Sequence, residues 1–211
     1  MIAGKPRDGG SIDSGMKEIK MRSAMRSIVT MAVLGAMIAG CRTTPKSEEG
    51  KEDLQAGAQR AIERMTAADP DLRGFIDKAT GYAVFPKVGK GGLIAGGAYG
   101  RGIVYEQGNM IGYADLTQAT IGLQAGGQTY SQLIAFENAE ALNRFRTNQL
   151  EFSANASAVI LKKGAATAAK YENGVAIFVE PRAGAMAEAS VGGQKFTFVP
   201  ATAGGTTRPA P

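Results

Sequence analysis

The chain has 211 residues and 44% hydrophobic content, which suits one domain with a sizeable core and is too short to suggest two. The formal net charge is +5, but residues 1–40 hold 6 Lys/Arg against 3 Asp/Glu, so the remainder carries only +2. This near balance argues against nucleic-acid binding, which requires a strongly basic surface. Histidine is absent, which excludes every catalytic or metal-binding mechanism that uses imidazole.

The single cysteine, Cys41, ends a segment with the order of a bacterial lipoprotein signal. A basic segment comes first, with Lys17, Lys20, Arg22 and Arg26. The uncharged, mostly apolar run 28–39 follows, which is too short to span a bilayer comfortably. It ends in Ile38-Ala39-Gly40-Cys41, which resembles a lipobox. We therefore expect a leader over 1–40 and a covalent lipid anchor on Cys41; the alternative is a buried core cysteine.

Residues 41–53 are polar and charged, which is typical of a flexible tether between the anchor and a domain. Apolar residues then recur at helical spacing and predict an amphipathic helix over 53–67. A second helix follows, with Asp69 as its cap and Pro70 at its first position, and it ends at Gly81.

From residue 81 to 127 the sequence changes to short β-type runs rich in glycine. Alternation along 98–105, with bulky residues on one face and small ones on the other, predicts a strand. Gln107-Gly108-Asn109 predicts a hairpin turn into a strand over about 110–123. Further strands are predicted over 129–136, 152–161, 175–180, 184–191 and 194–199, with a helix over 138–148 capped by Asn138.

These elements predict an α+β domain over 54–200, in which a curved, mainly antiparallel β-sheet or partial barrel has helices packed on its outside. The tail 201–211 is rich in Gly, Thr and Pro and is expected to be disordered.

No motif for catalysis or a cofactor is complete. The glycine-rich segment lacks the spacing of a P-loop or a dinucleotide fingerprint, and Gly-x-Ser-x-Gly is absent. Carboxylate catalysis is a remaining alternative, with Asp115, Glu180 and Glu188 as candidates, although nothing in the sequence shows that two of them converge. We expect no enzyme activity, no cofactor and no metal site.

Basic residues cluster between 78 and 101 and alternate with aromatic residues. The cations are Lys78, Lys87, Lys90 and Arg101, and the aromatic residues are Tyr82, Phe85 and Tyr99. Such a group fits lipid phosphates, with the rings at headgroup level. The alternative is ordinary solvated charge, and Lys162-Lys163 is a weaker second candidate.

Residues 54–199 resemble the SYLF-domain family in its bacterial lipoprotein branch. The resemblance rests on GYAVFPKVGKGGLIAGGAYGRGIVYEQG (81–108), GYADLTQATIGLQAGGQTYSQLI (112–134) and GQKFTF (193–198). It implies a non-catalytic, lipid-binding module, because eukaryotic members bind phosphoinositides; some also bind actin, an unlikely partner for an exported bacterial lipoprotein.

The sequence thus predicts an envelope lipoprotein that binds anionic phospholipid through Lys78, Lys87, Lys90 and Arg101, or through the helix over 53–67. Arg42 after the cysteine resembles the sorting pattern for the outer membrane. The alternative is a structural or protein-interaction lipoprotein of the envelope whose only lipid contact is its acyl anchor.

Overall fold

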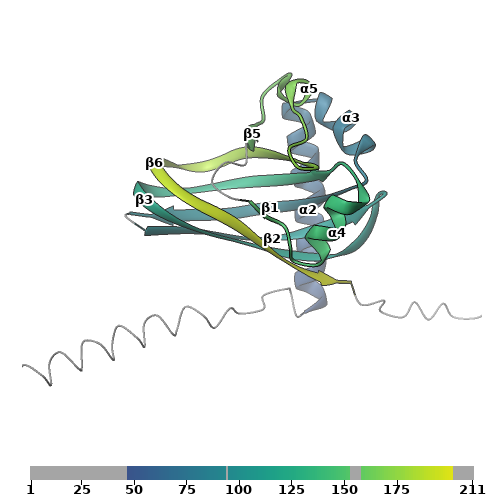
Figure 1. Ribbon diagram of the computed structural model, residues 1–211, viewed down its shortest axis with the longest axis horizontal. Coiled ribbons are helices and arrows are strands. Elements are labelled where there is room, and N and C mark those ends of the chain that lie inside the picture. The colour runs from purple at the N-terminus through teal and green to yellow at the C-terminus, as the bar shows by residue number, and fades with distance from the viewer. Residues whose placement is uncertain (1–46, 94, 153–157, 202–211) are drawn as a thin grey trace, which may run out of the picture. The chain divides into compact units, whose positions relative to one another are not determined.

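A computed structural model describes residues 47–93, 95–152 and 158–201, with side chains described outside 121–125, 151–152 and 185–192. The expected leader, Cys41 and the tail from 202 lie outside these residues. The described residues belong to one compact unit, Thr43–Pro211. Its elements form an α+β fold around a single curved sheet, as predicted (Figure 1).

The first described helix, α2, spans Glu48–Ala68. The Ser47 side chain caps it by accepting a hydrogen bond from the Gly50 amide, and two glutamates in its first turn favour its positive end. The helix therefore starts five residues before the predicted position. Residues 48–53, which we assigned to the tether, are helical because polar residues are compatible with an exposed first turn and a half.

The second helix, α3, spans Asp71–Lys78, and a short helix, α5, spans Ala165–Ala168. Asp69 joins them. Its carboxylate is fully buried and accepts hydrogen bonds from the amides of Asp71 (3.3 Å), Gly164 (3.1 Å) and Ala166 (2.6 Å). The N-cap of α3 is Pro70 rather than the predicted Asp69, and the helix begins one residue later than predicted. The Asp69 carboxylate instead links the starts of α3 and α5, and α5 is an element that its sequence, AATA, did not indicate.

Strands β1 (Gly81–Gly92) and β2 (Ala95–Glu106) form an antiparallel hairpin. Strand β3 (Asn109–Phe136) wraps around this hairpin. Its first half pairs with β2 from Glu106–Asn109 to Ala95–Ile121, and its second half pairs with β1 from Gly92–Gly126 to Gly81–Phe136. The two strands predicted over 110–123 and 129–136 are therefore halves of one bent strand.

Strand β6 (Val175–Pro200) follows the outer edge of β3 in the same sheet and bends with it. It pairs with β3 from Phe136–Val175 to Gly112–Pro200. The three runs predicted there also form one strand. Two short strands border the sheet: β4 (Glu151–Phe152) pairs with the C-terminal part of β6, and β5 (Ala158–Ile160) pairs in parallel with its N-terminal part. We call the end where the hairpin turns and β3 and β6 bend the arch end; it consists of 91–93, 95–97, 121–127 and 184–193.

One face of the sheet is covered by α2, α3 and α5. Their buried residues pack with outward-facing strand residues in one hydrophobic cluster. The α2 helix crosses this outer face at a steep angle to the strands, as Figure 1 shows. Helices outside a curved sheet were predicted, and these three confirm it.

The opposite face is concave, because side chains from distant strands meet across it. The rings of Phe85 in β1 and Phe196 in β6 lie 5.8 Å apart. Gln132 in β3 and Gln194 in β6 exchange amide hydrogen bonds of 2.9 and 3.3 Å. The helix α4 (Ala139–Arg146), capped by Asn138 as predicted, contributes Phe145 to this inner cluster. It therefore covers the inner face, which departs from the prediction that the helices lie outside.

The small residues that we predicted on one face of β2 leave room for this inner core. A Cβ atom at Gly102 would lie 2.7 Å from the Phe85 ring, and one at Gly100 would lie 2.8 Å from the Val88 side chain. Both distances are below any real Cβ contact, so the glycines allow large residues of β1 to cross over β2.

Candidate functional site

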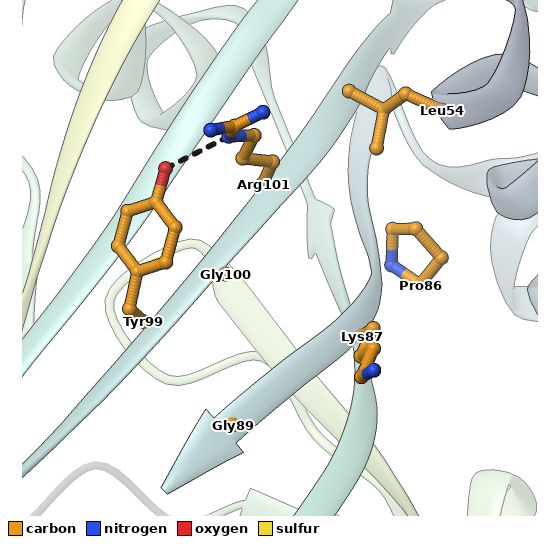
Figure 2. Close-up of a pocket in the computed structure, with 7 residues that line it drawn as sticks. All are labelled: Leu54, Pro86, Lys87, Gly89, Tyr99, Gly100 and Arg101. Atoms are coloured by element: carbon orange, nitrogen blue, oxygen red, sulfur yellow. Dashed lines mark hydrogen bonds between the residues drawn. The ribbon is translucent and has the colours of Figure 1, made fainter. Parts of the chain in front are cut away.

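An open groove of about 330 Å³ lies between α2 and the outer face of the β1–β2 hairpin. Leu54 of α2 and Pro86 of β1 give it apolar walls, as Figure 2 shows. Tyr99, Lys87 and Arg101 bring polar and charged atoms to the same space. The full lining is Leu54, Pro86, Lys87, Gly89, Tyr99, Gly100 and Arg101.

Lys87 and Arg101 are direct cross-strand partners in the β1–β2 pairing. Side chains at such positions start roughly 5 Å apart, and two like charges there destabilise the sheet unless an anion lies between or beside them. Arg101 is oriented by its neighbours, because its Nε donates to the Tyr99 hydroxyl at 3.0 Å and that hydroxyl donates to Asp115 at 3.2 Å. The Lys87 side chain is exposed, whereas Arg101 also has Asp115 of β3 as its register partner on its other side. The mouth of the apolar groove therefore carries two cations, of which Arg101 lies beside a carboxylate.

An irregularity in β1 sets the direction of Lys87. The register shifts between Val84 and Lys87, and Pro86, which has no amide hydrogen, occupies this bulge. The Pro86 carbonyl accepts hydrogen bonds from the Ser131 hydroxyl (2.9 Å) and from Arg182 (3.4 Å). The bulge is thus held by side chains of β3 and β6 rather than by the ladder.

Ser131 also helps to hold α2 over the groove. Arg64 of α2 donates to the Ser131 hydroxyl at 3.2 Å, and its Nε lies 3.5 Å from the Glu180 carboxylate. The Gly57 backbone passes close to the Pro86 ring, with room for a Cβ at 3.5 Å. The helix, the bulge and the cation pair therefore form one connected structure.

Lys90 lies on the other face. Side chains alternate along a strand, and the pairing is regular from Lys87 to Gly92, so Lys87 and Lys90 point to opposite sides. The register partners of Lys90 are Ala98, a residue of the inner cluster, and Gln128. The structure therefore separates two lysines that sequence proximity had grouped together.

Lys78 is also remote from the groove. It is the last residue of α3 and precedes β1, whereas the first β1 residue of the groove is Pro86, eight positions further along the chain. The expected aromatic partners are divided in the same way. Phe85 is fully buried and Tyr82 stacks on Tyr105 at 4.9 Å, so of the three only Tyr99, 40% exposed, lies at the groove.

The candidate carboxylates have structural partners. Asp115 accepts from Tyr99 and Glu180 pairs with Arg64, while the side chain of Glu188 in β6 lies outside the described part. Within that part, no group of three or more acidic, cysteine or histidine side chains is placed to hold a metal ion. None of the helices described is both long and apolar enough to cross a membrane.

Sequence reasoning found Lys87, Arg101 and Tyr99 but missed Leu54 and Pro86. The signal for Pro86 was present, because a proline inside a strand run indicates a bulge or an edge. No local pattern connects Leu54 with residues more than thirty positions away. Together these residues can hold an anionic group on the cations and an apolar chain against the walls.

Residues 117–200 match the family model described as Ysc84, the Las17-binding protein actin regulator. The chain is also 29% identical over 154 residues to the beta cell expansion factor A of Aeromonas veronii. Both matches agree with the predicted resemblance to the SYLF family. The second match covers 72% of this chain and 59% of the relative. The family match covers most of β3 and all of β6, while the groove residues precede it, so the role of these residues is a proposal.

Proposed function

We propose that this protein, like the SYLF-domain proteins it resembles, binds anionic phospholipid at a membrane surface, without catalysis, through the groove between α2 and the β1–β2 hairpin. The observation that carries the proposal is the cross-strand pair Lys87–Arg101 beside the apolar walls of Leu54 and Pro86. A phospholipid complements both parts of this site, because its phosphate can lie against the cations and its acyl chain against the apolar walls.

The two cations set the size of the expected effect. Each Lys or Arg near an anionic surface contributes about 1 kcal/mol, so the pair contributes about 2 kcal/mol, or roughly 30-fold in affinity. The Debye length falls from about 10 Å at 0.1 M salt to about 3 Å at 1 M, so high salt should weaken binding.

We further propose that Cys41 carries the lipid anchor expected from its signal, in the bacterial envelope and on the outer membrane. An anchor would keep the groove near the bilayer, and weak headgroup affinity would then be enough to orient the domain. Lys78 and Lys90 are not part of the groove lining.

The test is flotation of residues 43–211 with liposomes of phosphatidylcholine alone or mixed with phosphatidylglycerol. Both hydrophobic clusters lie within residues 58–198, so this segment keeps the whole core and lacks the anchor. Replacing Lys87 and Arg101 together by Gln should reduce binding to the anionic liposomes about 30-fold. Replacing the exposed Lys162 and Lys163 by Gln, with the same loss of charge, is the matched control.

Equal effects of the two double variants would contradict the groove as the binding site. No binding of the parent to any anionic liposome would favour the alternative function, an envelope interaction protein whose lipid contact is its own anchor.

A further inference from the structure

The volume of the groove limits the lipid that can occupy it. The groove between α2 and the β1–β2 hairpin measures about 330 Å³. A methylene group occupies roughly the 30 Å³ that one water molecule takes in the liquid, so the groove holds about eleven methylene groups, the greater part of one acyl chain. Two chains of this length would need about twice the volume, so a diacyl phospholipid fits with one chain at most.

Glycine at position 89 keeps part of this space open (Figure 2). Side chains alternate along a strand, so Gly89 shares the outward face of Lys87 and lies opposite Tyr99 of β2. A Cβ atom at Gly89 would meet nothing within 4 Å, so the backbone tolerates a side chain there and the groove exists because none is present. Gly100 differs, because a Cβ there would lie 2.8 Å from the Val88 side chain and packing requires glycine.

The groove is open on the side of the arch end. The next outward pair along the hairpin is Gly91 and Gly97, and neither residue has a side chain that could close the groove. A chain longer than the groove would extend over these glycines into water. Its additional methylene groups would stay exposed and would therefore contribute little to binding.

The charges at the mouth of the groove match a head with one negative charge. Lys87 and Arg101 supply two positive charges, and Asp115, the register partner of Arg101 in β3, supplies one negative charge. The sum is +1, which one phosphodiester or one carboxylate balances. The Tyr99 hydroxyl accepts a hydrogen bond from Arg101 Nε at 3.0 Å, so the guanidinium is held beside the groove before an anion binds.

The origin of the lipid decides whether burial of its chain favours binding. A chain that comes from water gains up to about fourfold in affinity for each methylene group that the groove buries. A chain that comes from the interior of a bilayer gains nothing, because it was already in hydrocarbon. The apolar walls of Leu54 and Pro86 therefore favour a lipid dispersed in water, and a single chain leaves a membrane far more readily than two.

We propose that the groove binds a single-chain anionic lipid, with its chain along Leu54, Pro86 and Gly89 and its head on Lys87 and Arg101. This inference rests on the proposed function, because the same cations bind the head, and it names the class of lipid that the site takes. Two sources share this chemistry: a lysophospholipid, whose head is a phosphodiester, and a free fatty acid, whose head is a carboxylate.

The first test varies the length of the chain. Residues 43–211 are titrated calorimetrically with lysophosphatidylglycerols, each below its critical micelle concentration. From the octanoyl to the dodecanoyl lipid, four methylene groups are added within the groove, and affinity should rise about 15-fold to 250-fold, for half to full burial of each group. From the dodecanoyl to the hexadecanoyl lipid, the added groups lie beyond the groove, and affinity should change by less than about threefold. Dodecanoate, titrated in parallel, distinguishes the two sources by which lipid binds more tightly.

The second test fills the groove. In Gly89→Phe the new side chain would occupy roughly two thirds of the groove, at about 30 Å³ per carbon, so affinity for the dodecanoyl lipid should fall at least tenfold. The matched control is Gly74→Phe. Gly74 is also exposed, and a Cβ there would likewise meet nothing within 4 Å, but it lies in α3 and does not line the groove. The control should bind as the parent does, and circular dichroism shows whether each variant is folded.

Affinity that continues to rise from the dodecanoyl to the hexadecanoyl lipid overturns the single-chain site, and so does equal binding by two folded glycine variants. Flotation of the parent with phosphatidylglycerol liposomes is measured beside the titrations. Flotation without binding of either single-chain lipid overturns this inference and leaves the proposed function in place. The absence of both kinds of binding overturns the proposed function itself.

Discussion

The most direct test of the fold is the replacement of Asp69 by Ala. The change removes a fully buried carboxylate that accepts three backbone amides, from Asp71, Gly164 and Ala166. A hydrogen bond to a charged group contributes about 1.5 to 3 kcal/mol, and a buried donor left without a partner costs about 1 to 3 kcal/mol.

The loss of the hydrogen bond to Asp69 does not cost the same free energy at all three amides. Asp71 and Gly164 are exposed residues whose amides can turn to water, whereas Ala166 is buried and makes the shortest bond, at 2.6 Å. We therefore expect the free energy of unfolding to fall by about 2 to 4 kcal/mol, and the melting temperature by about 5 to 15 °C for a domain of this size.

Urea unfolding followed by circular dichroism measures the loss. The matched control is Asp71→Ala at the same junction, because its carboxylate accepts one exposed bond from the Thr167 hydroxyl at 2.7 Å, for which we expect less than about 1 kcal/mol. If the two variants are equally stable, the carboxylate of Asp69 does not join α3 to α5 as described. Amide exchange should show faster exchange at Ala166 in the Asp69 variant alone.

Two further predictions concern the anchor and the tyrosines. The Cys41→Ser variant of the full chain should lose incorporation of labelled fatty acid; label equal to that of the parent would exclude the lipoprotein signal. Burial raises the pKa of Tyr82 and of Tyr105 above the usual value of about 10. Because the folded state then holds these protons more tightly than the unfolded state, the contribution of these two phenols to stability should be constant below about pH 10 and fall as the pH rises further. Absorbance titration should show these phenols ionising after an exposed one, and replacing both by Phe should remove part of the alkaline loss.

The parts of the fold that local chemistry determines could be predicted from the sequence. Asn138 caps α4 where its side chain indicated, and the predicted hairpin turn has positive φ at Gln107 and Gly108, at 49° and 79°. The continuity of β3 and β6 could not be predicted in this way. Glycines such as Gly126 and Gly184 indicate strand ends in a linear reading, and only pairing with a neighbouring layer carries a strand through them.

The candidate site could also be predicted only in part from the sequence. Sequence proximity brought Lys87 and Arg101 into one group, and the hairpin makes them partners. It also included Lys90 and Lys78, because clustering along the chain does not show which face of a strand a residue occupies or how far a strand extends. The facing of Lys87 depends on the bulge at Pro86, which is held by Ser131 and Arg182 from distant strands.

The nesting of β1–β2 inside β3, and of β3 inside β6, also implies an order of assembly. The hairpin can close from local contacts alone, whereas β3 finds its full set of partners only once the hairpin exists, and β6 only once β3 has bent around it. Closing long loops before any contact stabilises them is slow, so each finished layer serves as the template for the next. We therefore expect the sheet to fold outward from the hairpin over residues 81–106. A mutation that prevents the hairpin from forming should also prevent the pairing of β3 and β6.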